Sequence, residues 1–160
     1  NRGVTYSRRG LYGQAARDFD EAIRLEPQFV DAYFNRGVAY YRQSLYGPAI
    51  EQYDEAIRLD PQKAEAFSNR GLAYSDLGDS GRALDDFNRA IGLDPDLADA
   101  YYNKGVVYNR LGQNELAIAN YDNYIRLDPR YAGAYYNRAI NHSILGSYEL
   151  AVAAAASKPH

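Results

Sequence analysis

Asparagine recurs every 34 residues along this chain, and its side-chain amide is the clearest chemistry that the sequence offers. The amide has one acceptor and two donors, a set that suits bidentate pairing with a peptide backbone. Asparagine is an average-to-poor helix former, so helix propensity does not explain the recurrence. The series predicts a row of backbone-binding groups, with the alternative that each amide only bonds neighbouring side chains. The recurring residues are Asn1, Asn35, Asn69, Asn103 and Asn137.

The groups on which most enzymes depend are missing from the 160 residues. The chain has no cysteine and two histidines, one of which, His160, is the last residue. It contains no glycine-rich phosphate loop, no G-x-S-x-G nucleophile turn and no H-E-x-x-H zinc motif. Acidic pairs such as Asp85 and Asp86 are expected on the solvated face of a helix. The sequence therefore predicts no catalytic residue, no metal site and no cofactor, and a protein that is not an enzyme.

Charge and hydropathy argue against two further classes. The 18 Lys and Arg residues against 21 Asp and Glu residues give a net charge of −3, whereas nucleic-acid-binding domains usually carry a basic surplus. No stretch approaches about 18 consecutive apolar residues, so no membrane insertion is expected. The apolar fraction of 46% is ordinary for a globular protein and argues against disorder. The compartment stays open, with the cytoplasm preferred.

The elements that carry the asparagines repeat with the same period. In the unit that starts at Val30, apolar residues fall at i, i+4, i+7 and i+8 from Tyr33, and a second helical face begins at Ala49. A Leu-Asp-Pro sequence ends the second face, because a residue before proline is pushed out of the α region. Each unit is therefore predicted to be a helical hairpin that buries its apolar stripe against its neighbours. The prolines that set the period are Pro27, Pro61, Pro95 and Pro129.

These units resemble the tetratricopeptide repeat, a family of 34-residue helical hairpins. Numbered from 1 to 34, a unit has a large residue at position 4, a small one at 8 and Tyr at 11, then Ala at 20, an aromatic residue at 24 and Pro at 32. Small residues let two helices approach closely, and aromatic rings fill the space beside them. The resemblance implies an all-α fold, a right-handed superhelical solenoid of antiparallel helical hairpins. In the unit from Val30 the matching residues are Tyr33, Gly37, Tyr40, Ala49, Tyr53 and Pro61.

The repeats cover the chain from end to end, so residues 1–160 are predicted to form a single array of about five repeats. The first repeat starts at position 6, without its opening five residues, and the last stops at position 29. The chain is therefore expected to be a piece of a longer protein. The predicted repeats are 1–29, 30–63, 64–97, 98–131 and 132–160.

In this family the first helices of successive repeats line a concave groove, and the resemblance places the asparagines, at position 6, within it. Position 5 is aromatic in three repeats, position 9 is aliphatic, and positions 13 and 2 are mostly basic and acidic. These residues predict an apolar and aromatic groove with backbone-binding amides and charged edges. The predicted peptide-binding residues are Phe34, Asn35, Val38, Tyr41, Arg42, Asn69, Tyr102, Asn103, Val106, Arg110, Tyr136 and Asn137.

One subtype of ligand is not expected. Some chaperone-binding members hold a peptide C-terminal carboxylate with a clamp of Lys, Arg and Asn residues. Here position 5 carries no Lys, position 9 is aliphatic, as at Val38, and position 2 is acidic, as at Asp31. The sequence therefore argues against a carboxylate clamp for heat-shock proteins.

A second regularity predicts contacts between repeats. Position 7 is basic in every unit, and position 25 of the preceding unit is acidic except at Asn88, which precedes the one lysine, Lys104. We expect a contact from each position 25 to the next position 7, as between Asp54 and Arg70. An exposed pair of this kind contributes at most about 1 kcal/mol.

Three departures from the pattern stand near the C-terminus. Tyr124 occupies position 27, where Ala is usual, and is expected either to repack against Tyr131 and Tyr135 or to reach a ligand. His142 replaces the usual Tyr at position 11 and is expected to be half-buried rather than a metal ligand. The last helix is rich in alanine, with Ala155 in place of an aromatic residue at position 24.

The function predicted from these features is that of a protein–protein interaction scaffold, which binds a peptide or helix of a partner in its concave groove. One alternative is self-association through the uncapped ends, which would give a homo-oligomer. Another is a targeting arm of a larger enzyme. The identity of the partner does not follow from the sequence, because this fold serves many complexes.

Overall fold

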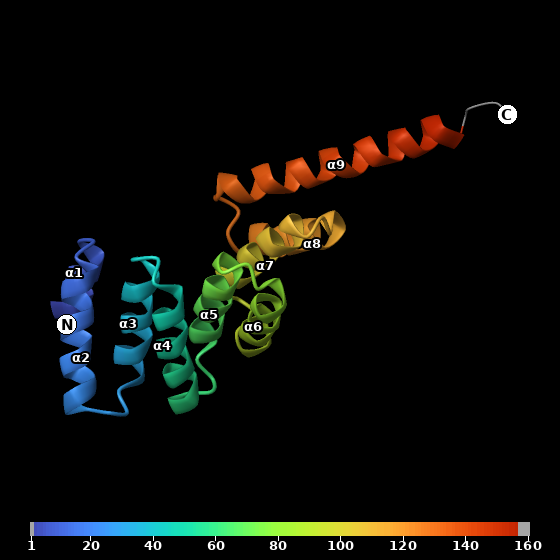
Figure 1. The fold of residues 1–160 in the computed structure, drawn as a ribbon. Coiled ribbons are helices and arrows are strands. Elements are labelled where there is room, and N and C mark those ends of the chain that lie inside the picture. The colour runs from blue at the N-terminus through green and yellow to red at the C-terminus, as the bar shows by residue number, and fades with distance from the viewer. Residues whose placement is uncertain (1, 157–160) are drawn as a thin grey trace. The chain divides into compact units, whose positions relative to one another are not determined.

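The computed structural model describes residues 2–156, with side chains for residues 2–149. These residues form α-helices connected by short turns, and the described part of the chain contains no strand (Figure 1). No helix within it is long and apolar enough to cross a membrane. The helices are α1 (Arg2–Arg8), α2 (Tyr12–Leu25), α3 (Val30–Tyr41), α4 (Tyr46–Leu59), α5 (Ala64–Asp76), α6 (Ser80–Leu93), α7 (Ala98–Arg110), α8 (Asn114–Leu127) and α9 (Ala132–Ala156).

The chain divides into two compact units, Asn1–Leu97 and Ala98–His160, and the division falls at a predicted repeat boundary. In the first unit, α1 to α6 lie next to one another in chain order, so that α2 packs on α3 and α4 packs on α5. In the second unit, α7 packs on α8, and α8 packs on α9. The all-α stack of helical hairpins predicted from the sequence is confirmed.

The turn inside each hairpin depends on a residue with left-handed backbone geometry. Gly10, Gly78 and Gly112 have φ values of 75°, 83° and 71° at position 15 of their repeats. Glycine adopts this region without a Cβ clash. Ser44 holds the same position in the second repeat with a φ of 60°, the one non-glycine residue with positive φ in the described chain.

The turn between hairpins follows from the Leu-Asp-Pro sequence. The side chains of Asp60, Asp94 and Asp128 each accept a hydrogen bond from the backbone N–H two residues on, at 3.0, 3.0 and 3.2 Å. Such a local bond stabilises a turn against continuation of the helix. Proline at the next position has no N–H to give to a longer helix. The second helices therefore end at Leu59, Leu93 and Leu127.

Each complete hairpin is held together by an aromatic ring packed on a glycine. A Cβ built on Gly37 would lie 2.6 Å from the ring of Tyr53, and one on Gly105 would lie 2.8 Å from Tyr121. Both rings are buried, at 1% and 0% exposure. The pairing of large with small residues predicted at positions 24 and 8 is therefore confirmed.

The fifth repeat differs from the expected hairpin. Residues 132–156 form one continuous helix, α9, and Gly146 lies inside it where a turn is predicted. Because no second helix folds back, His142 is exposed and not half-buried as expected. The pair that closes the other hairpins is changed here to Ala139 at position 8 and Ala155 at position 24, which offers much less apolar area to bury.

Candidate functional site

The predicted binding residues lie on the first helices of the repeats, on α3 and α5 in the first unit and on α7 and α9 in the second, except Arg42, which directly follows α3. The four asparagines among them are all half-buried, but two of the amides donate hydrogen bonds within the fold and two do not. Asn35 donates to the backbone carbonyl of Asp31 at 2.7 Å, and Asn137 donates to the hydroxyl of Tyr102 at 3.0 Å. The amides of Asn69 and Asn103 have no hydrogen-bond partner in the part of the chain that the structure describes.

In the first unit, the ring of Phe34 contacts two other side chains. Its ring centroid lies 6.0 Å from that of Tyr53, and the ammonium of Lys63 lies 5.1 Å from the ring. The same ammonium pairs with Asp31 at 2.9 Å, with 62% of the Asp31 side chain exposed. Phe34 therefore offers a ligand only part of its ring.

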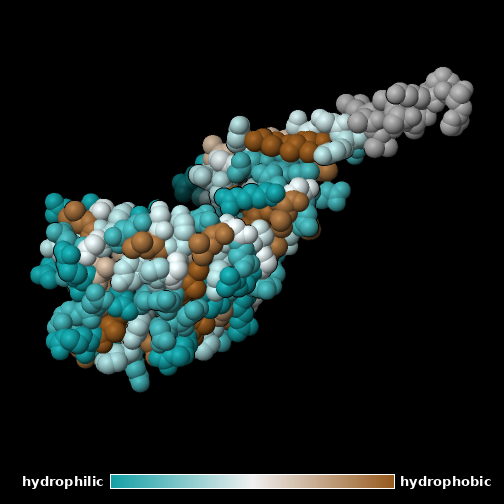
Figure 2. Space-filling model, in the orientation of Figure 1, coloured by the Kyte–Doolittle hydropathy of each residue, from teal (hydrophilic) through white to brown (hydrophobic). Residues whose placement is uncertain are grey.

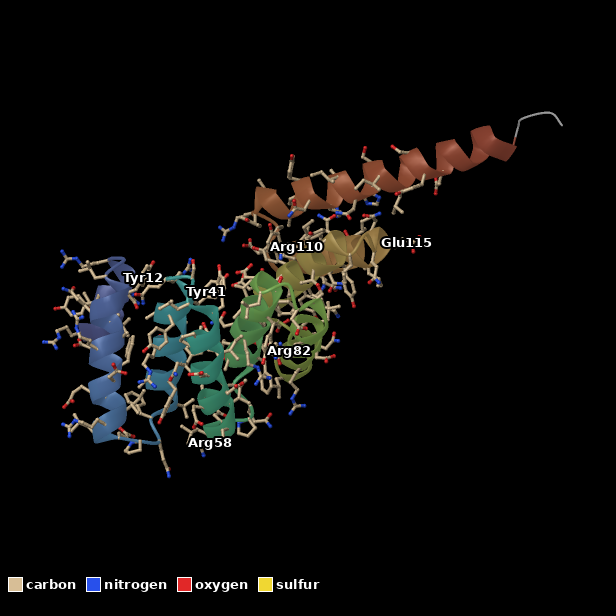
Figure 3. The ribbon with its side chains drawn as sticks, viewed as in Figure 1. Tyr12, Tyr41, Arg58, Arg82, Arg110 and Glu115 are labelled. Atoms are coloured by element: carbon tan, nitrogen blue, oxygen red, sulfur yellow. The ribbon has the colours of Figure 1, made fainter. Side chains whose placement is uncertain are left out.

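Tyr41 lies at the C-terminal end of α3 (Figure 3). Its hydroxyl donates to the carboxylate of Asp76 on α5 at 2.5 Å, and its ring packs on Tyr46 with centroids 5.5 Å apart. Burial and the adjacent carboxylate raise the pKa of Tyr41, which keeps the phenol protonated. Tyr41 thus joins two repeats, while Val38 is half-buried beside it and Arg42 is exposed.

In the second unit, Tyr102 belongs to an aromatic cluster with Tyr121, Tyr124 and Tyr131. Its ring centroid lies 5.8, 5.4 and 5.4 Å from those three rings. Tilted and edge-to-face arrangements of this kind are favourable for aromatic pairs. Burial, followed by the neighbouring Tyr131, raises the pKa of Tyr102.

This cluster accounts for Tyr124, which is only 6% exposed. It repacks against Tyr131 as one interpretation predicted, with a centroid separation of 5.6 Å, but its other ring partner is Tyr102 and not Tyr135. A Cβ on Gly133 would lie 2.8 Å from the Tyr131 ring, so the missing side chain at position 2 makes room for that ring.

Of the remaining predicted residues, Tyr136 is exposed, at 68%. Val106 is half-buried, and Arg110 is exposed at the end of α7 (Figure 3). Among the predicted residues of the second unit, the phenol of Tyr136, the amide of Asn103 and the side chain of Val106 are therefore open to a ligand.

The predicted ion pairs between repeats are present within the units. Arg36 pairs with Asp20, Arg70 with Asp54 at 2.6 Å, and Arg138 with Asp122 at 2.5 Å. These contacts confirm the hypothesis that position 25 meets the next position 7. Each of these basic side chains therefore lies between the first helix of its own repeat and the second helix of the preceding repeat.

A further partner of these bases was missed from the sequence, and the expectation that Asp86 lies on the solvated face of its helix was wrong, because its side chain is buried. Arg70 also binds Asp86 of its own repeat, with Nε and Nη2 donating at 2.8 and 2.6 Å. Arg2 makes the same bidentate contact with Asp18, and Arg36 bonds Gln52. All three acceptors stand at position 23, so their 34-residue spacing was the available signal. We name each position-7 base with its acceptors a rung.

The rung of Lys104 lacks a carboxylate. Position 23 of its repeat is Asn120, whose amide donates to the carbonyl of Leu116 at 2.8 Å. Lys104 forms no ion pair among the described residues, and burial lowers its pKa. No group of three or more carboxylate or imidazole side chains in the described chain could hold a metal ion.

The chain forms stacked two-helix repeats, and the first helices carry partly exposed polar and aromatic side chains. This architecture is that of a helical repeat protein. A profile of the tetratricopeptide repeat matches residues 1–64 and 68–132. The chain belongs to the tetratricopeptide repeat family.

Solved structures of this family are similar to the chain, although no curated protein sequence matches it. The crystal structure of MamA superposes with a TM-score of 0.80 at 29% identity, over 94% of this chain and 82% of that one. The first repeat domain of Spaghetti (RPAP3), bound to an HSP90 peptide, gives 0.72 at 26%, over 74% and 94%. YrrB, described as having an unusual peptide-binding site, gives 0.71 at 22%, over 90% and 74%.

Proposed function

We propose that the first helices of each unit bind an extended or helical segment of a partner protein, and that Asn69 in the first unit and Asn103 in the second each pair with the backbone of the segment bound there. The observation that carries the proposal is that both amides are half-buried and unpaired within the described chain. Neither amide is among the fully buried unpaired groups of the described chain, so each can exchange water for a peptide group, with a net gain of about 0.5–1.5 kcal/mol per bond. The peptide-binding relatives of similar fold support this role.

The two free amides are expected to contribute more than the other two asparagines. Asn35 and Asn137 already donate within the fold, so a ligand must compete with those bonds. Side-chain anchoring falls to Val38 in the first unit, and to Val106 and the exposed ring of Tyr136 in the second. A preformed surface of this kind loses little conformational entropy on binding.

The charges nearby favour a segment with basic residues. Glu65 and Asp99, both at position 2, are exposed and form no ion pair among the described residues. Because no Lys stands at position 5, a free C-terminal carboxylate is not the group recognised. The ligand is therefore an internal segment with apolar side chains and at least one Lys or Arg.

The test is selection from a displayed library of random peptides on the immobilised chain. Peptides enriched by the wild type are measured against Asn69→Ala and Asn103→Ala, each of which should weaken binding by about 1–2 kcal/mol. Asn35→Ala and Asn137→Ala should have smaller effects. Asn88→Ala, exposed on the second helix α6, is the matched control. Equal affinity for all five variants would refute the role of the free amides.

A further inference from the structure

One buried hydroxyl in the second unit has no partner within the fold. Tyr121 on α8 is 0% exposed, and its hydroxyl forms no hydrogen bond in the part of the chain that the structure describes. A buried donor that is left unpaired lowers stability relative to an apolar group of the same shape. The equivalent residues of the first and third repeats are Phe19 and Phe87, both buried, so packing at position 24 needs only the ring. The fold therefore does not explain this hydroxyl.

The Tyr121 hydroxyl lies against α7. A Cβ built on Gly105 would be 3.2 Å from Cζ, the ring carbon of Tyr121 that bears the hydroxyl, and the Tyr102 ring centroid is 5.8 Å from that of Tyr121. Burial, followed by the Tyr102 phenol, raises the pKa of Tyr121 to about 12, and the Arg110 guanidinium acts in the opposite direction. The hydroxyl is therefore a donor at neutral pH that lies near Tyr102 and Arg110.

These two neighbours belong to the predicted binding face of α7. Tyr102, Val106 and Arg110 follow at intervals of four residues, so they lie along one face of the helix. Asn103, whose amide has no partner within the described chain, lies one turn before Val106 on the same side. The Tyr121 hydroxyl thus lies beneath the surface on which the proposed ligand binds.

The groups at this place favour an acceptor with a negative charge. The Tyr121 hydroxyl is a donor without an acceptor, and the Arg110 guanidinium is a permanent cation that carries several donors. A carboxylate has two oxygens and can accept from both groups. Hydrogen bonds to a charged acceptor are stronger than neutral ones, so a carboxylate gains more here than a peptide carbonyl.

We propose that the second unit binds an aspartate or glutamate side chain of the partner segment, whose carboxylate accepts from the Tyr121 hydroxyl and pairs with Arg110. The hydroxyl is covered in the free chain, and the carboxylate reaches it when the exposed side chain of Arg110 turns toward the ligand. This subsite deepens the proposed function and rests on it, because the acid belongs to the segment that Asn103 holds. Apolar surface on the described part of α9 indicates that apolar side chains flank the acid (Figure 2).

The first unit has the same residue types but a different charge beside them. Tyr53 and Arg42 stand at the equivalent positions 24 and 13. Tyr41, next to Arg42, already donates to the carboxylate of Asp76 at 2.5 Å, and this charge repels a ligand carboxylate. Because Tyr53 is buried like Tyr121, at 1% exposure, Tyr53→Phe is the matched control for Tyr121→Phe.

The test is selection from a displayed library of random peptides on the immobilised chain. Peptides enriched by the wild type should carry Asp or Glu at one fixed position among apolar residues. Tyr121→Phe should bind them about 10-fold more weakly, and Tyr53→Phe should bind them as the wild type does. Replacing the peptide acid by its amide should weaken binding to the wild type by a similar factor and have a much smaller effect on Tyr121→Phe.

Thermal unfolding of Tyr121→Phe provides the second measurement. The melting temperature should stay the same or rise, because the change removes only an unpaired hydroxyl. A fall of several degrees would show that the hydroxyl has a partner within the fold and would overturn the subsite. Enriched peptides that depend on Asn103 but carry no fixed acid would also overturn it and leave the proposed function standing. If the wild type enriches no peptide, both fail.

Discussion

Arg70 binds Asp86 and Asp54 at the same time and so joins two successive repeats. Its Nη2 lies 2.6 Å from Asp86 Oδ1, and its Nη1 lies 2.6 Å from Asp54 Oδ1. The two carboxylates differ in environment, because the side chain of Asp86 is 8% exposed and that of Asp54 is 49% exposed. The bond within the repeat is therefore shielded from water, while the bond between repeats is open to it.

The first prediction follows from this difference. Asp86→Ala should lower the free energy of unfolding by about 2 kcal/mol, because it leaves the half-buried guanidinium of Arg70 without its bidentate acceptor. Asp54→Ala should cost less than about 1 kcal/mol, since the exposed pair is screened by solvent. Urea unfolding followed by circular dichroism measures both. A larger loss for Asp54→Ala would contradict this ranking.

An Arg–Asp pair can be introduced in the rung of Lys104 by two substitutions. Lys104→Arg combined with Asn120→Asp places the residue types of Arg70 and Asp86 at positions 7 and 23 of the fourth repeat. We expect each single change to be neutral or destabilising, because a buried aspartate needs its partner. The double variant should show a favourable coupling of about 1 kcal/mol in a double-mutant cycle. Additive single effects would show that the two positions do not meet.

Substitution of the glycine at position 8 of the second repeat should be costly, whereas substitution of Gly92 should not. Gly37→Ala would bring a methyl group within 2.6 Å of the Tyr53 ring and should destabilise the fold by about 1–3 kcal/mol. Gly92→Ala is the control, because its Cβ would meet nothing within 4 Å inside α6. That change should stabilise by about 0.5–1 kcal/mol. Thermal unfolding of the two variants should shift in opposite directions.

The N-terminus of α6 gives a prediction that depends on pH. The Asp79 side chain accepts from the Arg82 backbone N–H at 3.0 Å, and this bond, followed by the Arg82 guanidinium, lowers the pKa of Asp79. A lowered carboxyl pKa stabilises the fold above the unfolded value, near pH 4, and this stabilisation is lost as the pH falls through the folded value. The difference in melting temperature between wild type and Asp79→Ala should therefore be present at pH 7 and vanish in strong acid.

The same position in the second repeat provides the converse test. Leu45 precedes α4 and makes no capping bond. Leu45→Asp should stabilise the fold by about 1 kcal/mol at pH 7 by capping the helix. The gain should disappear at low pH in parallel with the loss at Asp79, and a pH-independent gain would point to a cause other than the carboxylate.

Most of the fold could be predicted from the sequence because its contacts repeat. The 34-residue spacing marks the hairpins, the left-handed turns at Gly10, Gly78 and Gly112, and the rings that pack on position-8 glycines. The ion pairs between repeats, such as Asp54 with Arg70, were also predictable, since both positions recur every 34 residues. The bond to Asp86 was missed although its position carries a polar acceptor in each of the first four repeats.

By itself, the sequence determined the repeat, its two helices and the residue types that each repeat presents, since periodic residues make the same local contacts in each unit. Only the tertiary structure decided which of these side chains are free to bind a ligand. Asn69 is free while Asn137 bonds Tyr102, because the neighbouring repeats differ in residues that no period marks. It also decided that residues 132–156 form one helix, because a hairpin needs more buried apolar surface than the Ala139 and Ala155 positions supply.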